Sequence, residues 1–139
     1  MNLKTAIILC LSSGAVCFGK PNLQVEIPTI RIAAERNGIK FGSDDWYLIL
    51  AIRLQENGKA GCEFGIKHSE AWDTNLDTQA GWAAKTVFNQ HKRFGSNKVT
   101  SGYVNSLADR YCPKESDFEG NANWKKNVWL LFNKLRGEK

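Results

Sequence analysis

One apolar run, residues 44–56, is bounded by residues that begin and end helices. Ser43 is a good N-cap, and two aspartates follow it at the positive end of the expected helix. Gly58 is a natural stop just past the last turn. The run therefore predicts an apolar helix that ends at Glu56.

Glu56 stands on the apolar side of that helix. Ile49 and Ile52 precede it by seven and four positions, so the three side chains share one face. Partial desolvation and the negative helix C-terminus both favour the protonated carboxyl, so we expect a raised pKa for Glu56. A carboxylic acid that keeps its proton near neutral pH suits the general acid of a glycosidase. The alternative is a solvated glutamate at a helix end, which is common.

Four further helices are predicted from apolar spacing and from helix-ending residues. They cover residues 30–37, a segment from residue 77 or 78 to residue 95, residues 100–111, and a segment that begins near residue 123. Residues 57–76 are irregular and glycine-containing, and only residues 63–67 suit a short extended segment. The fold class is therefore mainly α, with about five helices and at most one very short β-hairpin beside the active-site cleft.

The first 19 residues resemble a secretory signal peptide. Lys4 is followed by a short apolar stretch, residues 6–11, and then by small residues. The stretch is too short to cross a membrane permanently. We expect a periplasmic or secreted protein without stable membrane insertion, in which residues 20–139 form a single domain. The alternative is a lipoprotein with Cys17 as the acceptor.

The net charge and the histidine content limit the classes of partner and ligand that the sequence suggests. The net charge of +5 is spread along the chain, a pattern that does not indicate nucleic-acid binding. A modest basic excess suits an anionic partner such as the bacterial cell wall, and it also suits ordinary solubility. His68 and His91 are the only histidines, and nothing around them has ligand spacing. We expect no metal and no cofactor.

Two cysteines, Cys62 and Cys112, remain once the signal peptide is removed. An even pair in an exported protein predicts a disulfide, which would contribute about 3–4 kcal/mol. The alternative is two free buried thiols. A bridge would bring Tyr111 next to Phe64, near the mouth of a cleft at Glu56. The alternative for Tyr111 is plain packing of its helix.

Five short motifs follow one another along the chain. They are Glu-Asn-Gly at 56–58, Glu-Phe-Gly-Ile-Lys at 63–67, Thr-Gln-Ala-Gly-Trp-Ala-Ala at 78–84, Arg-Tyr-Cys-Pro at 110–113 and Asn-Ala-Asn-Trp at 121–124. Their order resembles small transglycosylase-like proteins of the lysozyme-like superfamily, over about residues 44–132. The second motif is also similar to one in flagellar-type glucosaminidases. Those enzymes carry Glu-Ser-Gly at the catalytic position, and the two motifs are closer together here.

The resemblance implies a lysozyme-like domain that cleaves the β-1,4 glycan strand of peptidoglycan, as a lytic transglycosylase or muramidase. Glu56 would be the general acid and base, with Tyr111 across the cleft. The glycan would contact Phe64, Gly65, Ile66, Gln79 and Tyr103. Candidates for a second carboxylate are Glu63, Asp73, Asp77 and Asp109, and none stands in a distinctive motif. The pattern therefore favours a single-glutamate enzyme, since canonical glycosidases need two carboxylates.

Other functions stay open at this stage. A glucosaminidase-type hydrolase would use the same glutamate. A non-catalytic wall-binding module would keep the fold without the chemistry, and a secreted inhibitor would bind another protein. We expect a monomer, with a cell-envelope, phage-associated or secretion-associated protein as a further partner.

Overall fold

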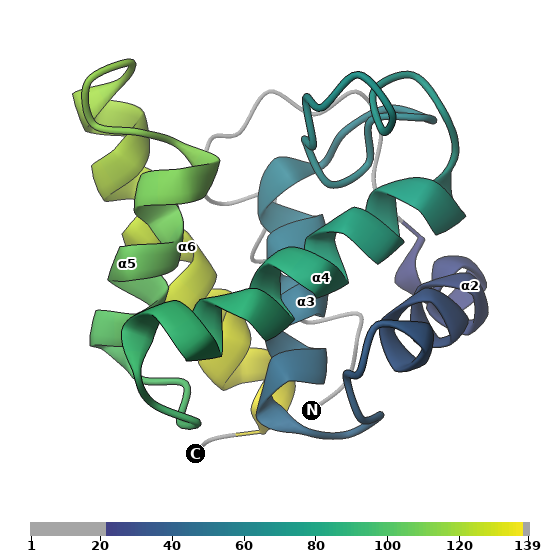
Figure 1. The fold of residues 1–139 in the computed structure, drawn as a ribbon, viewed down its shortest axis with the longest axis horizontal. Coiled ribbons are helices and arrows are strands. Elements are labelled where there is room, and N and C mark those ends of the chain that lie inside the picture. Colours follow the sequence, from purple (N-terminus) through teal and green to yellow (C-terminus); the bar gives the residue numbers. More distant parts are fainter. Residues whose placement is uncertain (1–21, 138–139) are drawn as a thin grey trace.

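The computed structural model describes residues 22–137, and within them the chain forms five helices and no strand. They are α2 (Leu23–Arg36), α3 (Asp44–Glu56), α4 (Leu76–Phe94), α5 (Ser101–Tyr111) and α6 (Phe118–Arg136). In Figure 1, α4 passes in front of α3, with α2 on one side and α5 and α6 on the other. The predicted mainly α fold is confirmed. The predicted signal peptide lies outside the described residues.

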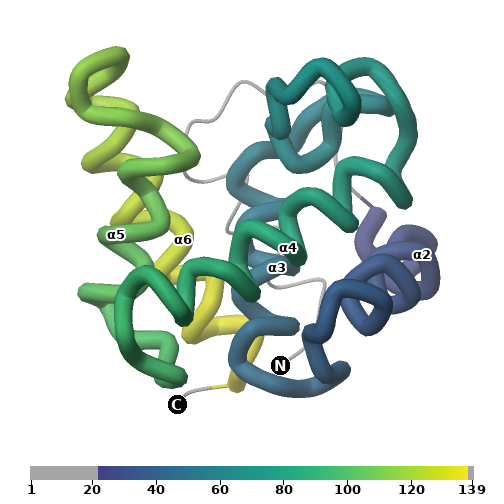
Figure 2. Tube along the Cα trace, in the orientation of Figure 1, coloured from purple at the N-terminus to yellow at the C-terminus, as the bar shows by residue number. Residues whose placement is uncertain are grey.

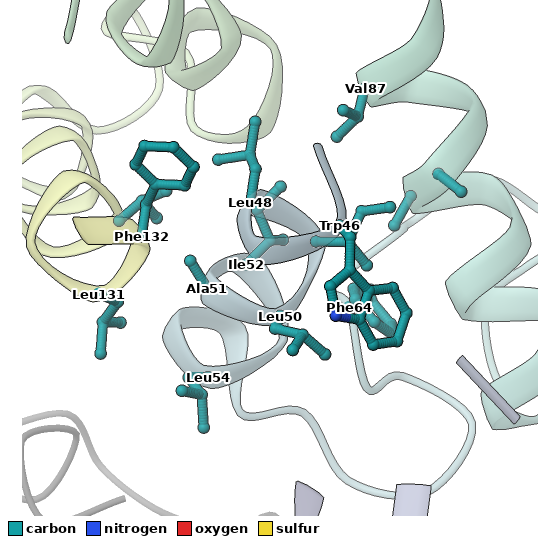
Figure 3. Packing of buried hydrophobic residues seen from close by; sticks show 14 of the residues in the cluster. Trp46, Leu48, Leu50, Ala51, Ile52, Leu54, Phe64, Val87, Leu131 and Phe132 are labelled. Atoms are coloured by element: carbon teal, nitrogen blue, oxygen red, sulfur yellow. The ribbon is translucent and has the colours of Figure 1, made fainter. Parts of the chain in front are cut away.

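α3 is the central helix of the core. Every residue from Leu48 to Leu54 is buried, so this stretch has no solvent-facing side. Figure 3 shows Phe132 and Leu131 of α6 on one side of α3 and Val87 of α4 on another. A helix that is apolar all round is stable only when neighbours cover it on several sides. The other helices supply that cover.

The two ends of α3 differ in how well the sequence predicted them. At the N-terminus, the Ser43 hydroxyl accepts a hydrogen bond from the Trp46 backbone N–H at 3.3 Å, as predicted. At the C-terminus, Asn57 rather than Gly58 takes the left-handed conformation, with φ of 45°. Gly58 is needed for space instead, because a Cβ there would overlap the carbonyl oxygen of Cys62.

α2 and α6 both begin earlier than predicted. α2 starts at Leu23, not at residue 30, and it contains Pro28. Leu23 and Ile30 are both fully buried, so the apolar face extends through the proline. α6 starts at Phe118, where Asp117 caps the helix by accepting from the Gly120 backbone N–H at 2.8 Å. Both helices carry a residue near the N-terminus that disfavours a helix, Pro28 in α2 and Gly120 in α6. Packing outweighs that preference in α2, and the Asp117 cap supports α6.

The segment between α3 and α4 folds back over the end of α3, as the tube in Figure 2 shows. Residues 63 and 64 form a turn and residues 65–67 are irregular, in place of the extended segment expected. Arg53 of α3 holds the segment through a 3.1 Å hydrogen bond to the carbonyl of Glu63. The same guanidinium binds both carboxylate oxygens of Glu26 in α2, at 2.8 and 2.9 Å. Arg53 therefore joins α2, α3 and the loop.

No helix within residues 22–137 is long and apolar enough to cross a membrane.

Replacing Arg53 tests how much this buried pair stabilises the fold. Arg53→Met leaves Glu26 and the Glu63 carbonyl without their partner, and we expect the free energy of unfolding to fall by about 3 kcal/mol. The control is Arg31→Met, because the Arg31–Glu35 pair is about half exposed and contributes less than about 1 kcal/mol. Urea denaturation measures both. Equal losses would contradict the role given to Arg53.

Candidate active site

Glu56 is the last residue of α3, and its side chain is only partly exposed. Its Oε1 accepts a hydrogen bond from the indole Nε1 of Trp124 in α6, at 2.7 Å. Burial raises the pKa of Glu56, while the Trp124 hydrogen bond and the charge of Lys67 lower it by less. The raised pKa predicted from the sequence is confirmed in direction. The carboxyl is therefore biased towards its protonated form.

Gly65 closes over the other carboxyl oxygen. A Cβ on Gly65 would lie 2.5 Å from Oε2 of Glu56, which is closer than side chains approach. Gly65 also has φ of +66°, a conformation that costs other L-residues about 1–2 kcal/mol. Two independent reasons thus favour glycine here, and the first of them places the loop backbone against the carboxyl group.

Tyr111, the last residue of α5, packs against the ring of Trp124. The two rings stack with centroids 5.3 Å apart and planes at 22°. The tyrosine hydroxyl is buried and has no hydrogen-bond partner among the described residues. Burial raises its pKa well above the ordinary value, and the nearby charge of Glu56 adds to the shift. Tyr111 therefore brings a neutral, unpartnered O–H group close to the glutamate.

The predicted disulfide is wrong: Cys62 and Cys112 are both free thiols. Cys62 is buried in the turn after α3, whereas Cys112 lines a cavity and its sulfur lies 4.0 Å from the carbonyl oxygen of Asp117. The thiols thus occupy different surroundings. Tyr111 is still near Glu56, but stacking on Trp124 places it there instead of a covalent bridge.

Gln79 of α4 is fully buried and holds the loop over the carboxyl group. Its side-chain oxygen accepts from the backbone N–H groups of Phe64 and Ile66, at 3.1 and 3.2 Å. Its amide nitrogen donates to the carbonyls of Ile66 and Ala71, at 3.0 and 2.7 Å. These four bonds use the hydrogen-bonding capacity of the amide. Gln79 is therefore a positioning residue, and the expectation that it contacts the glycan is corrected.

Phe64 and Tyr103 are also fully buried and do not line the cavity. Phe64 packs in the core. The Tyr103 hydroxyl donates to the carbonyl of Val87 at 2.9 Å, and its ring stacks on His91. His91 in turn binds the carboxylate of Asp45 at 2.8 Å. Asp45 is eleven residues before Glu56, or about 16 Å along α3, so Tyr103 belongs to the other end of the helix.

A cavity of about 890 Å³ opens beside Gly65 and Tyr111. Residues 65–68, one face of α4 and the segment joining α5 to α6 form its wall. Its volume is within the range of small-molecule sites, about 300–1,000 Å³. Of the predicted catalytic and glycan-binding residues, Gly65, Ile66 and Tyr111 line it. Glu56 itself does not line the cavity, but its carboxyl group lies against Gly65, which does.

Sequence reasoning missed two features of this site. Trp124 was part of a recognised motif, but no motif relates it to a glutamate 68 positions earlier. The second feature is a set of cationic residues in the cavity wall, Lys67, Lys85, Arg93 and Arg110. Their irregular spacing along the chain forms no motif. The one feature of the sequence that could have indicated this set is that Lys85 and Arg93 share a helical face.

The four candidates for a second carboxylate lie outside the cavity wall. Asp77 pairs with Arg36, and Asp109 binds Asn121 and Lys125. Glu63 is buried and accepts a hydrogen bond from the Gly61 backbone N–H. Asp73 is exposed in the loop. The carboxylate that does line the cavity among the described residues is Asp117, which was not predicted.

Within residues 22–137, no group of three or more histidine, cysteine, aspartate or glutamate side chains is placed to hold a metal ion. Comparisons of the chain with protein-family models, with curated proteins and with solved structures gave no match.

Gly65→Ala tests the contact between the loop and Glu56. The new Cβ would meet the carboxyl oxygen in addition to straining φ, so we expect a loss of about 2–4 kcal/mol in the free energy of unfolding. Gly42→Ala is the matched control, since Gly42 has φ of +79° with nothing within 4 Å of the added Cβ. It should cost only about 1–2 kcal/mol. Similar losses in the two variants would show that Gly65 is not pressed against the carboxyl.

Glu56→Gln tests the raised pKa through stability. Because burial raises the folded-state pKa of Glu56, folding disfavours the ionised form, and the wild type loses stability as pH rises through that pKa. Glutamine stays neutral and can still accept from Trp124. We expect the variant to be more stable than the wild type at pH 7, with the gap closing below pH of about 4.

Thermal unfolding across this pH range measures the gap. Glu70→Gln is the control, because Glu70 is exposed and should show no comparable trend. If Glu56→Gln were less stable than the wild type by the same amount at neutral and at low pH, the raised pKa of Glu56 would be refuted.

Proposed function

We propose that the protein cleaves the β-1,4 glycan strand of peptidoglycan, with Glu56 as general acid and then base, as a lytic transglycosylase or muramidase. The observation that carries this proposal is the carboxyl group of Glu56, which has a raised pKa and lies beside a cavity of ligand size. The ordered motifs described above are consistent with it. The predicted signal peptide would deliver the protein to the compartment that holds this polymer.

The chemistry begins with the protonated carboxyl. Glu56 donates its proton to the glycosidic oxygen, and the bond from that oxygen to C1 of the muramyl sugar breaks. The carboxylate then accepts the proton of the sugar's own C6 hydroxyl as its oxygen attacks C1. The product is a 1,6-anhydro ring, the glutamate is protonated again, and no water is consumed. A raised pKa suits this cycle because one group must give and take a proton.

Two neighbouring hydrogen-bond donors, Trp124 and Tyr111, assist the carboxyl group of Glu56. The N–H of Trp124 points at Oε1 and stabilises the carboxylate after it has donated its proton. The Tyr111 hydroxyl has no partner among the described residues, so it is free to donate to the carboxylate or to a substrate oxygen. We infer that Trp124 orients Glu56 and that Tyr111 assists at the reacting centre.

The composition of the cavity wall supports a single-glutamate mechanism. Asp117 is its one carboxylate among the described residues, and that side chain caps α6 through Gly120. A hydrolase would need a second carboxylate facing the sugar from the other side. A hydrolytic muramidase or glucosaminidase is therefore the second candidate, with Asp117 as the group to examine.

Digestion of purified peptidoglycan tests the proposal. We expect soluble muropeptides from the wild type and a loss of at least about 100-fold in rate for Glu56→Gln, the size of effect typical for a general acid. Glu70→Gln serves as the matched control and should keep full activity. Because the acid must be protonated, activity should fall as pH rises through the pKa of Glu56.

Mass spectrometry of the products decides between mechanisms. Ends with 1,6-anhydro rings support the transglycosylase, and reducing ends with water incorporated support a hydrolase. Equal digestion by wild type and Glu56→Gln would refute Glu56 as the acid. Binding without digestion would indicate a wall-binding module, and no binding at all would favour a secreted inhibitor.

A further inference from the structure

The cavity beside Glu56 collects positive charge from three separate parts of the chain. Lys67 comes from the loop, Lys85 and Arg93 from α4, and Arg110 from α5. Lys85 and Arg93 are eight residues apart on one helical face, or about 12 Å along the axis. Folding thus gathers these side chains around one concave wall.

None of the four cations forms an ion pair with another residue in the described range 22–137. The structure's ion pairs instead engage other residues, among them Arg36 with Asp77 and Lys125 with Asp109. Among the described residues, the carboxylate that lines the same cavity is Asp117, whose Oδ1 already accepts a hydrogen bond from the Gly120 N–H. Like charges gathered in a concave site raise the local positive potential. A bound anion would lower that potential.

The same wall offers a flat aromatic surface. Trp82 lines the cavity, and its ring stacks on His68 with centroids 4.3 Å apart and planes at 24°. Trp82 and Lys85 also line a second, smaller hollow of about 300 Å³, which extends the surface towards α2. In that hollow, Arg36 is paired with Asp77, whereas Lys85, which also lines the first cavity, forms no ion pair with a described residue.

We propose that this cavity is a binding site for a glycan that carries carboxylate groups, with Lys85, Arg93 and Arg110 binding the carboxylates and Trp82 packing on a sugar face. The inference rests on the proposed function and adds the feature that the protein selects in its substrate. Arginine suits this task because its planar guanidinium can bind a carboxylate through two hydrogen bonds.

A nucleic acid is the less favoured anion. Nucleic-acid surfaces carry basic residues in a stripe or patch that follows the phosphate backbone. Here the unpaired cations surround one cavity beside a carboxyl group that prefers to keep its proton. That arrangement fits carboxylates attached to a sugar whose glycosidic bond lies near Glu56.

Binding assays in the Glu56→Gln background test the inference without digestion of the ligand. The ligands are intact peptidoglycan, peptidoglycan with its peptide stems removed by an amidase, neutral chitin and a DNA oligonucleotide. The test variant is Lys85→Glu/Arg93→Glu. The matched control, Lys40→Glu/Lys126→Glu, changes the net charge equally at exposed lysines outside the cavity wall. Circular dichroism confirms that each variant is folded.

We expect intact peptidoglycan to bind at least about tenfold more tightly than chitin, and added salt to weaken that preference. The cavity variant should lose the preference, and the control should keep it. Binding that survives stem removal assigns the carboxylate to the muramyl sugar, and binding that is lost assigns it to the peptide stem. Equal affinity for chitin, an equal loss in the control variant, or tighter binding of DNA would overturn the inference.

The inference and the proposed function can fail separately. Charge-dependent binding of peptidoglycan that the wild-type protein does not digest would leave the site intact and refute the catalytic proposal. Digestion that is insensitive to the Lys85 and Arg93 substitutions would support the catalytic proposal and refute the carboxylate-binding site.

Discussion

The hydrogen bond from Trp124 to Glu56 is the contact on which the candidate site depends. It joins the end of α3 to α6, the helix that packs along α3. Burying a carboxyl group costs free energy unless the group is neutral or hydrogen-bonded. Here one oxygen accepts from the indole and the other is pressed against Gly65. The effect of burial outweighs that of the indole hydrogen bond, so the buried acid favours its protonated form.

Local signals were enough to predict most of the fold. The cap at Ser43 and the helix end at residue 95 lie where expected, because each acts on its own turn of helix. The errors arose where tertiary packing outweighed local preference. α2 runs through Pro28 because its apolar face is buried on both sides of the proline. Residues 63–67 form no strand, because Gln79 binds the backbone N–H groups of Phe64 and Ile66.

The site was predicted in part, for reasons that differ by residue. Glu56 and its raised pKa followed from position on one helix. Gly65 lies at the carboxyl group, whereas its neighbour Phe64 points into the core. The expected disulfide is absent, yet Tyr111 lies near Glu56 because its ring stacks on Trp124. Contacts between residues so distant along the chain depend on helix packing, which no single motif encodes.

The central claim is that the fold keeps a proton on Glu56 at pH values where an ordinary glutamate has lost it. A ¹³C NMR titration of the side-chain carboxyl, assigned by the signal missing in Glu56→Gln, measures this directly. The account predicts a midpoint above the value of about 4.3 for an unperturbed glutamate, and a further rise in Trp124→Phe, which lacks the indole donor. A midpoint at or below that value would contradict it.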